Sequence, residues 1–335
     1  MVYSLHPRLI GPLLSLSLLL PSGCAQQEGA SPTLETTRAA LSISVPSDAA
    51  TIQAAIDSAN AGDSVVVSAG AFAEDLTIDK ALTLIGSGTE TIIYGSIIVA
   101  NNAEVSLENL VIDGTLSSSA ASCISLDSGS LTMTQVTTRG GDIGLNIVAG
   151  GSGAPGQALL NGCTFTAAAT AGVRLSAEST AGLQVFNSTF AYNGGDGLLL
   201  EAGTSADSTM IAHTLFFANG YGMLDGAAIW STGGDFTFNN NIITSNNNGV
   251  ACLFACSGAH NLVWGNLINF DAAATAGPGH IHKDPRFVAA SEGDYSLMAD
   301  SPAIDAGDTS LAAITALSVD ANGLPRPLGA GPDIG

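Results

Sequence analysis

Basic residues are scarce in this chain. Eight Lys and Arg stand against 29 Asp and Glu, which gives a formal net charge of −21. A field of this sign repels phosphate backbones, so the composition argues against a nucleic-acid partner. It also disfavours polyanionic ligands, unless a cation such as Ca²⁺ bridges one acid to another. An acidic surface is otherwise an ordinary route to solubility.

Charged and aromatic side chains are few as well. Charged residues make up 11% of the chain and aromatic residues 5%, whereas there are 40 glycines. Small residues suit closely stacked backbone with tight corners, where bulky side chains would not fit. Because disordered chains are poorer in hydrophobic residues than the 46% found here, we expect a packed core.

The apolar run near the N-terminus, residues 9–20, is too short to cross a bilayer, which takes about 20 residues. It follows His6 and Arg8 and therefore matches an export signal. The small residues before Cys24 resemble the lipobox of bacterial lipoproteins, although Pro21 stands where that family usually has Leu. The resemblance implies a signal peptide over residues 1–23 and acylation of Cys24. The alternative is an ordinary cleaved signal with an incidental cysteine.

Residues 24–44 are polar and predict a flexible tether between the lipid and the folded body. Acylation would make the membrane a partner of the protein through its lipid anchor. We therefore expect an exported lipoprotein at the outer membrane or cell surface of a bacterium. Ala25 after the cysteine, by resemblance to enterobacterial sorting rules, favours the outer membrane.

The other four cysteines agree with export. Cys252 and Cys256 lie four residues apart and are predicted to close a small disulfide loop. Cys123 and Cys163 either form a second bridge or are buried as small hydrophobic side chains.

A phrase recurs along the body of the chain: apolar-x-Asn-x-x-apolar-x-x-Asn, then Gly and an alternating apolar strand. The clearest copy contains Val185, Asn187, Phe190, Asn193, Gly197 and Leu198; another is predicted to end at Gly222 and Met223. The central apolar positions are spaced by 29, 25, 26 and 27 residues, and they are Val136, Phe165, Phe190, Phe216 and Ile243.

A period near 25 residues predicts a coil of three short strands, each pairing with the same strand of the next coil. No coil can bury its apolar face alone, so stability comes from stacking. Asn at the corners, or His213 in place of one, tolerates left-handed backbone and bonds to the coil below. We therefore predict an all-β fold, a single-stranded parallel β-helix over residues 45–335. A leucine-rich repeat has a shorter period, and a β-sandwich would not repeat one phrase in register.

The start of this region predicts a short helix over residues 47–59, with Ser47 or Asp48 as its N-cap. Its apolar face is formed by Ile52, Ala55, Ile56 and Ala59. Such a helix would plug the first coil and cover an open sheet edge.

Two stretches carry a family resemblance. ATIQAAIDSANAGDSVVV and DLTIDKALTLIGSG resemble the first coil of the pectin-lyase-like superfamily, whose members are right-handed parallel β-helices. DPRFVAASEGDYSLMADSPAIDAGD and DANGLPRPLGAGPDIG resemble the choice-of-anchor Q region of bacterial surface proteins, here about residues 260–335. The resemblance implies a right-handed coil and display at the cell surface.

Polysaccharide lyases of that superfamily use an Arg or Lys base and often a Ca²⁺ ion that bridges the substrate to acidic residues. The candidate here is Arg174, which is predicted to face outward in mid-strand. Pairing of Arg174 with Glu201 or Asp127 is the structural alternative. Its predicted outward column contains Ser125, Asn146, Leu199 and Leu224.

Other candidates are predicted to be structural. Asp142 and Asp196 recur in Gly-Gly-Asp turns and are expected to cap corners, while Asp225 and Asp235 are isolated. No third metal ligand accompanies His280 and His282, so we expect a loop there and no resident cofactor or metal, apart from structural or substrate-bridging Ca²⁺. The candidate ligands for such a Ca²⁺ ion are four aspartates of the C-terminal part, Asp294, Asp300, Asp305 and Asp308.

These observations favour a non-catalytic surface protein, an adhesin, glycan-binding protein or envelope scaffold, whose partners are extracellular polysaccharide or envelope components. Leu199, Leu224 and Ala251 are predicted to form part of a flat outward face for such contacts. The alternative is a polysaccharide lyase or another carbohydrate-active enzyme.

Overall fold

The computed structural model describes residues 39–116, 122–148, 156–201, 209–223, 226–233, 236–310, 317–321, 323–327 and 329–335. Every described residue except Ala39 lies in one compact unit, Ala40–Gly335. The predicted signal peptide and Cys24 lie outside the described residues, as do Leu224, Asp225 and Asp235. No helix of the described part is long and apolar enough to cross a membrane.

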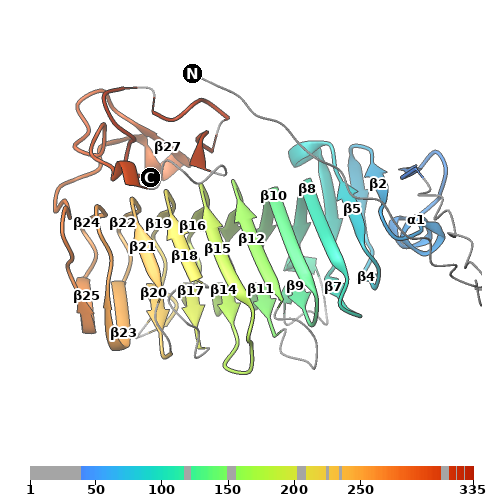
Figure 1. Ribbon diagram of the computed structural model, residues 1–335, viewed down its shortest axis with the longest axis horizontal. Helices are drawn as coiled ribbons and strands as arrows, with labels where there is room; N and C mark the ends of the chain where they lie inside the picture. Colours follow the sequence, from blue (N-terminus) through green and yellow to red (C-terminus); the bar gives the residue numbers. More distant parts are fainter. Residues whose placement is uncertain are drawn as a thin grey trace, which may run out of the picture. The chain divides into compact units, whose positions relative to one another are not determined.

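Two large sheets of parallel strands wind around a common core (Figure 1). The longer sheet has 16 strands: β1 (Ser42–Val45), β2 (Asp63–Val67), β3 (Gly70–Phe72), β5 (Leu82–Ile85), β6 (Thr91–Tyr94), β8 (Glu104–Asp113), β10 (Ser130–Arg139), β12 (Gln157–Asn161), β13 (Thr164–Thr166), β15 (Gly182–Phe186), β16 (Thr189–Ala191), β18 (Thr209–Ala212), β19 (Leu215–Phe217), β21 (Thr237–Asn239), β22 (Ile242–Thr244) and β24 (Leu262–Trp264).

The second sheet has nine strands: β4 (Leu76–Ile78), β7 (Ile97–Val99), β9 (Ser122–Leu126), β11 (Ile143–Ile147), β14 (Ala171–Leu175), β17 (Asp196–Leu200), β20 (Ala227–Ser231), β23 (Asn248–Ser257) and β25 (Ile268–Thr275). A small antiparallel pair is formed by β26 (Phe287–Ala289) and β27 (Asp294–Leu297). Within the described residues, the helices are α1 (Ile52–Ser58) and three short 3-10 turns, Gly88–Glu90, Gly114–Leu116 and Ala290–Glu292. The predicted parallel β-helix is confirmed.

The core is a stack of equivalent side chains from successive coils. The rings of Phe165, Phe190 and Phe216 stack with centroids 4.9 and 4.8 Å apart. The predicted first member of this column was wrong, because Thr138 and not Val136 is in register with Phe165. Thr138 is fully buried, so the spacings along the column are an even 27, 25, 26 and 27 residues. A search for apolar positions misses it because threonine is polar.

The recurring asparagines serve two purposes. Asn187 and Asn240, with His213 between them, form a left-handed corner with φ of 50°, 58° and 49°, as predicted for that column. The side chains of Asn193 and Asn219 are instead buried, and each side-chain amide forms hydrogen bonds with the neighbouring coils. The left-handed residue of this second corner is the one before the asparagine.

Helix α1 closes the first coil with the predicted buried face. Its N-cap is Thr51, whose Oγ1 accepts a hydrogen bond from the Ala54 amide at 3.1 Å. The predicted N-cap Asp48 was wrong, because its carboxylate accepts from the Ser44 amide within the preceding turn. The Glu74 carboxylate accepts from the first two helical amides, each at 3.0 Å.

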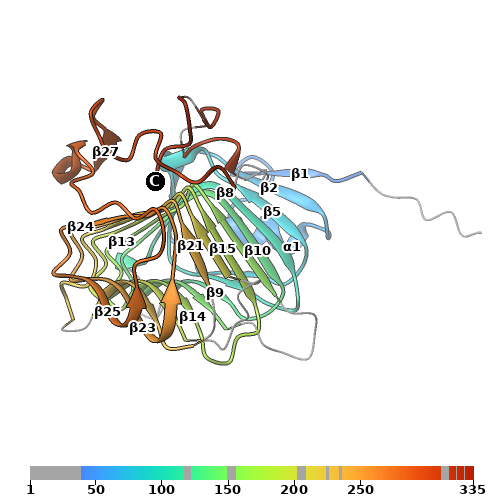
Figure 2. The same cartoon turned by 60° about the vertical axis from the view of Figure 1, so that its left-hand side comes forward.

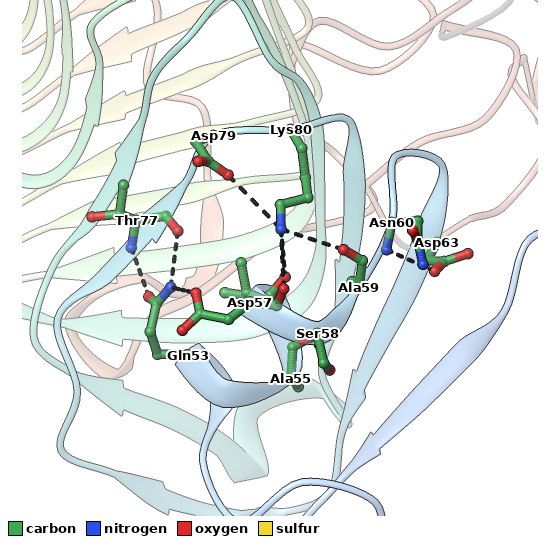
Figure 3. Close-up of polar contacts among 11 residues, drawn as sticks. Gln53, Ala55, Asp57, Ser58, Ala59, Asn60, Asp63, Thr77, Asp79 and Lys80 are labelled. Atoms are coloured by element: carbon green, nitrogen blue, oxygen red, sulfur yellow. Dashed lines mark hydrogen bonds and ion pairs between the residues drawn. The ribbon is translucent and has the colours of Figure 1, made fainter.

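The same helix also covers the edge of the nine-stranded sheet (Figure 3). The Gln53 side-chain amide pairs with the backbone N–H and C=O of Thr77 in β4, much as a neighbouring strand would. Lys80 donates from Nζ to the carbonyls of Ile56, Asp57 and Ala59 at the other end of the helix. These side chains therefore supply hydrogen-bond partners for the backbone groups at the sheet edge and at the helix end.

Two boundaries differ from the sequence prediction. Strand β1 begins at Ser42, inside the predicted tether, and pairs with β2. The solenoid strands end at Thr275, and Ile281 adds one further bridge, to Leu262. The chain after Ile281 does not coil but packs against the outer face of the 16-stranded sheet (Figure 2), where Ala303 and Ile334 bury the outward Leu215, Ile242 and Leu262.

Lys80→Met is expected to lower the free energy of unfolding by about 1–2 kcal/mol, because three carbonyls lose a charged donor. Lys283→Met, at an exposed position, is the matched control and should change stability by less than about 0.5 kcal/mol. Urea denaturation of both variants measures this. Equal stability of the two would show that Lys80 does not stabilise the cap.

Candidate functional site

The outer face of the nine-stranded sheet carries Arg174 in one column of side chains. The strand registers place Ser125, Asn146, Arg174 and Leu199 side by side as predicted. The next position was predicted wrongly: it is Trp230 rather than Leu224. Nine residues connect β19 to β20, whereas only four connect β16 to β17. The sequence prediction assumed the shorter spacing and therefore placed β20 too early, at Gly222. The column continues through Ala251 and Asp271.

Arg174 is held by the adjacent coil. Its Nε and Nη2 both donate to Oε2 of Glu201, at 2.9 and 2.7 Å. This confirms Glu201 as the predicted partner; the other candidate, Asp127, accepts instead from Ser125. The side chains of Arg174 and Glu201 are 36% and 27% exposed, so the pair lies at the surface of the face and can also contact a ligand.

Asp196 begins strand β17 on the same sheet. Its Oδ1 accepts from the Ala227 amide of the next coil at 2.7 Å, so it does cap a corner as predicted. Burial and, to a smaller extent, the nearby Glu201 carboxylate raise the pKa of Asp196 to about 7, against the lowering effect of the Ala227 amide. Asp142, its counterpart two coils earlier, accepts a hydrogen bond from Thr170 instead.

This face offers several kinds of contact. Trp230 is half-buried and lies between Leu199 and Ala251, which are almost fully buried. Of these three residues, only Trp230 offers apolar surface to a ligand, and the Arg174–Glu201 ion pair lies on one side of it. A sugar ring has an apolar C–H face that packs on aromatic surface and hydroxyls that pair with amide, guanidinium and carboxyl groups. The sequence signal that could have located Trp230 is the alternation of inward and outward residues over 227–231. It was overlooked because the strand was predicted to begin earlier, at Gly222.

A cleft of about 640 Å³ lies between the 16-stranded sheet and the C-terminal segment. His213 lines it; burial and the nearby Arg326 lower its pKa to about 3, against hydrogen bonds to the backbone of Asp333 and Gly335. Arg326 donates to Oδ1 of the corner residue Asn187 at 2.7 Å. These groups hold the C-terminal segment on the solenoid, so we assign the cleft a structural role.

The cysteines divide as the sequence suggested. Cys252 and Cys256 form a disulfide in β23. Cys123 and Cys163 are buried free thiols rather than a second bridge. Burial raises their pKa values, to about 11 for Cys123 and about 12 for Cys163, so both stay protonated at neutral pH.

The candidate Ca²⁺ residues of the C-terminal segment each bond within the protein: Asp294 to Ser296, Asp300 to Arg286, Asp305 to Gly331 and Asp308 to Ser310. His280 and His282 point their ring nitrogens at backbone carbonyls of the preceding coil. Within the described ranges, no group of three or more His, Cys, Asp or Glu is placed to hold a metal ion.

The sequence matches the family described as "Right handed beta helix region" over residues 87–268, more than half of the chain. Among solved structures, the fold is similar to that of the pectate lyase Pel9A, with a TM-score of 0.53 and 13% identity, covering 89% of this chain and 96% of that one. ORF18 of Geobacillus virus E2 matches with a TM-score of 0.40 and 15% identity over 68% of this chain and 56% of that chain. No curated protein matches the sequence.

Asp196 is expected to titrate near pH 7. Its folded-state pKa lies above the ordinary value of 3.8, so its protonation stabilises the fold fully below about pH 4, and that contribution is lost as the pH rises through about 7. Asp196→Asn should remove this loss while its side-chain oxygen still accepts from Ala227. Carboxyl ¹³C chemical shifts followed against pH measure the titration. A midpoint near 4 would contradict the assignment.

Proposed function

The chain belongs to the right-handed β-helix family, and from this premise we propose that it is a surface lipoprotein that binds polysaccharide without cleaving it. The observation that carries the proposal is the outward column with Trp230 between Leu199 and Ala251 and the Arg174–Glu201 ion pair beside it. The column runs across successive coils, so a linear polysaccharide laid along it would contact several of them.

The state of Arg174 supports binding rather than lyase chemistry. A base must be neutral to take the proton next to a uronate carboxylate. Arg174 instead uses both Nε–H and Nη2–H as hydrogen-bond donors to Glu201, which is the usual role of a guanidinium in an ion pair. Arg174 therefore suits a hydrogen-bond donor to a saccharide better than a proton acceptor.

Address and anchoring belong to the same proposal. Acylated Cys24 would hold the protein at the outer membrane or cell surface, and residues beyond it would act as the tether. The C-terminal segment, which resembles a choice-of-anchor Q region, supports display at a cell surface. Envelope polysaccharide is then the nearest ligand.

A carbohydrate-active enzyme is the second candidate. It is supported by Asp196, whose pKa of about 7 lets the carboxyl hold its proton up to nearly neutral pH, as a general acid requires, and by Glu201 as a second carboxyl nearby. Incubation with pectate, alginate and chondroitin, with and without Ca²⁺, tests it. Unsaturated products lost in Arg174→Ala indicate a lyase; new reducing ends lost in Asp196→Asn indicate a hydrolase. Either result contradicts the non-catalytic proposal.

Trp230→Ala is expected to weaken polysaccharide binding about tenfold, since truncating a ring at the centre of a contact costs about 1–2 kcal/mol. Affinity electrophoresis in gels containing xylan, mannan, glucan or pectate measures the change. Phe254→Ala, which removes a 64% exposed ring from the part of β23 that the disulfide spans, is the matched control. Equal retardation of the two variants and the parent protein would exclude the Trp230 face.

Cells grown with a palmitate analogue should label the protein, and Cys24→Ser should abolish the label. An unlabelled wild type, or a label that persists in Cys24→Ser, would refute acylation at this cysteine. Binding by the Trp230 face does not depend on this outcome.

A further inference from the structure

A second cavity, of about 420 Å³, lies on the 16-stranded sheet, between the last coils and the C-terminal segment. We call it the Trp264 notch. Its wall from the solenoid is formed by Thr244, Ser245 and Trp264, and its wall from the C-terminal segment by Asp284, Arg286 and Met298. No side chain of the Trp230 column takes part in it.

The position of Trp264 in the coil exposes its ring. The register places Phe217, Thr244 and Trp264 in one outward column of the 16-stranded sheet. Strand β24 ends the path of that sheet, and beyond it the described chain adds the single bridge of Ile281 to Leu262. The residue is 38% exposed, and Met298 across the notch is 41% exposed. Two large apolar groups thus face solvent at one cavity, where burial by a ligand would be favourable.

The floor of the notch is rigid. Phe217 packs edge-on to Phe287 and lies against Tyr295, at centroid distances of 6.2 and 5.2 Å. Arg286 has a left-handed backbone, φ 57°, which is held by the Asp284 carboxylate accepting from its amide at 2.8 Å. The cavity is therefore formed before any ligand arrives, which reduces the entropy lost on binding.

The charges at the rim select the kind of ligand. Arg286 pairs with the Asp300 carboxylate, and Asp284 adds a second acid, so the acids outnumber the guanidinium. A polyanion would meet this excess and the net charge of −21 of the whole chain. The hydroxyl of Ser245 and the carboxylates suit a neutral ligand that has hydroxyl groups and one apolar face.

We propose that the Trp264 notch is a separate binding site for a neutral saccharide, whose ring packs on the Trp264 indole. It lies on a different sheet from the Trp230 face and does not depend on that face binding anything. If both sites are occupied, one solenoid holds a polysaccharide at two points, and its avidity exceeds that of either site.

The chain has two tryptophans, Trp230 and Trp264, so removing one of them lets the tryptophan fluorescence report on the other site by itself. In the full-length Trp230→Phe variant, Trp264 is the sole indole. Titration with hexasaccharides of cellulose, xylan and mannan should shift its emission to the blue and protect it from iodide quenching for at least one of the three. Trigalacturonate should leave the emission unchanged. Met298→Ser in this background should weaken the response about fivefold, since apolar contact area is lost.

The proposal is overturned if none of the three hexasaccharides changes Trp264 emission at about 10 mM, or if trigalacturonate is the ligand that does. The reciprocal Trp264→Phe variant reports on Trp230. A response at Trp264 with none at Trp230 leaves the notch standing and removes the proposed face; the reverse result removes the notch alone.

Discussion

The structure depends on hydrogen bonds that pass from one coil to the next through buried asparagine side chains. Asn219 shows the pattern. Its backbone N–H and its side-chain Nδ2 both donate to Oδ1 of Asn246 in the next coil, and Nδ2 also donates to the Phe190 carbonyl of the preceding coil. Asn193 repeats the arrangement one coil earlier. A buried amide without such partners would destabilise the fold, so each coil is stable only with its neighbours in place.

The same dependence sets the requirements at the ends of the solenoid and on its outer faces. Helix α1, with the Gln53 amide on β4, supplies at the first coil the partners that a preceding coil would supply. The C-terminal segment covers outward apolar residues of the last coils and is held by Arg326 on the corner residue Asn187. Where no coil and no segment covers an aromatic ring, as at Trp264, an exposed surface remains. The two proposed saccharide sites are such places, on rigid sheet.

The sequence predicted the fold well because its signal repeats in every coil. Asn187, Phe190 and Asn193 with their equivalents established the period. The register offered Glu201 or Asp127 as the partner of Arg174, and the structure selects Glu201. Prediction failed where a coil departs from the repeat. The long turn before β20 displaced Trp230 from its expected place, and the polar Thr138 concealed a core position. The raised pKa of Asp196 and the notch beside Trp264 could not be predicted, because both depend on burial by segments distant in sequence.

A double-mutant cycle on Asn193→Ala and Asn219→Ala tests the dependence between coils most directly. Asn193 donates from its backbone N–H and from Nδ2 to Oδ1 of Asn219, so we predict a coupling of about 1 kcal/mol or more in the free energy of unfolding. Asn193→Ala combined with Asn261→Ala, in a separate ladder, should be additive within about 0.5 kcal/mol. Additivity of the first pair as well would contradict the account, because the coils would then be stable without the ladder that joins them.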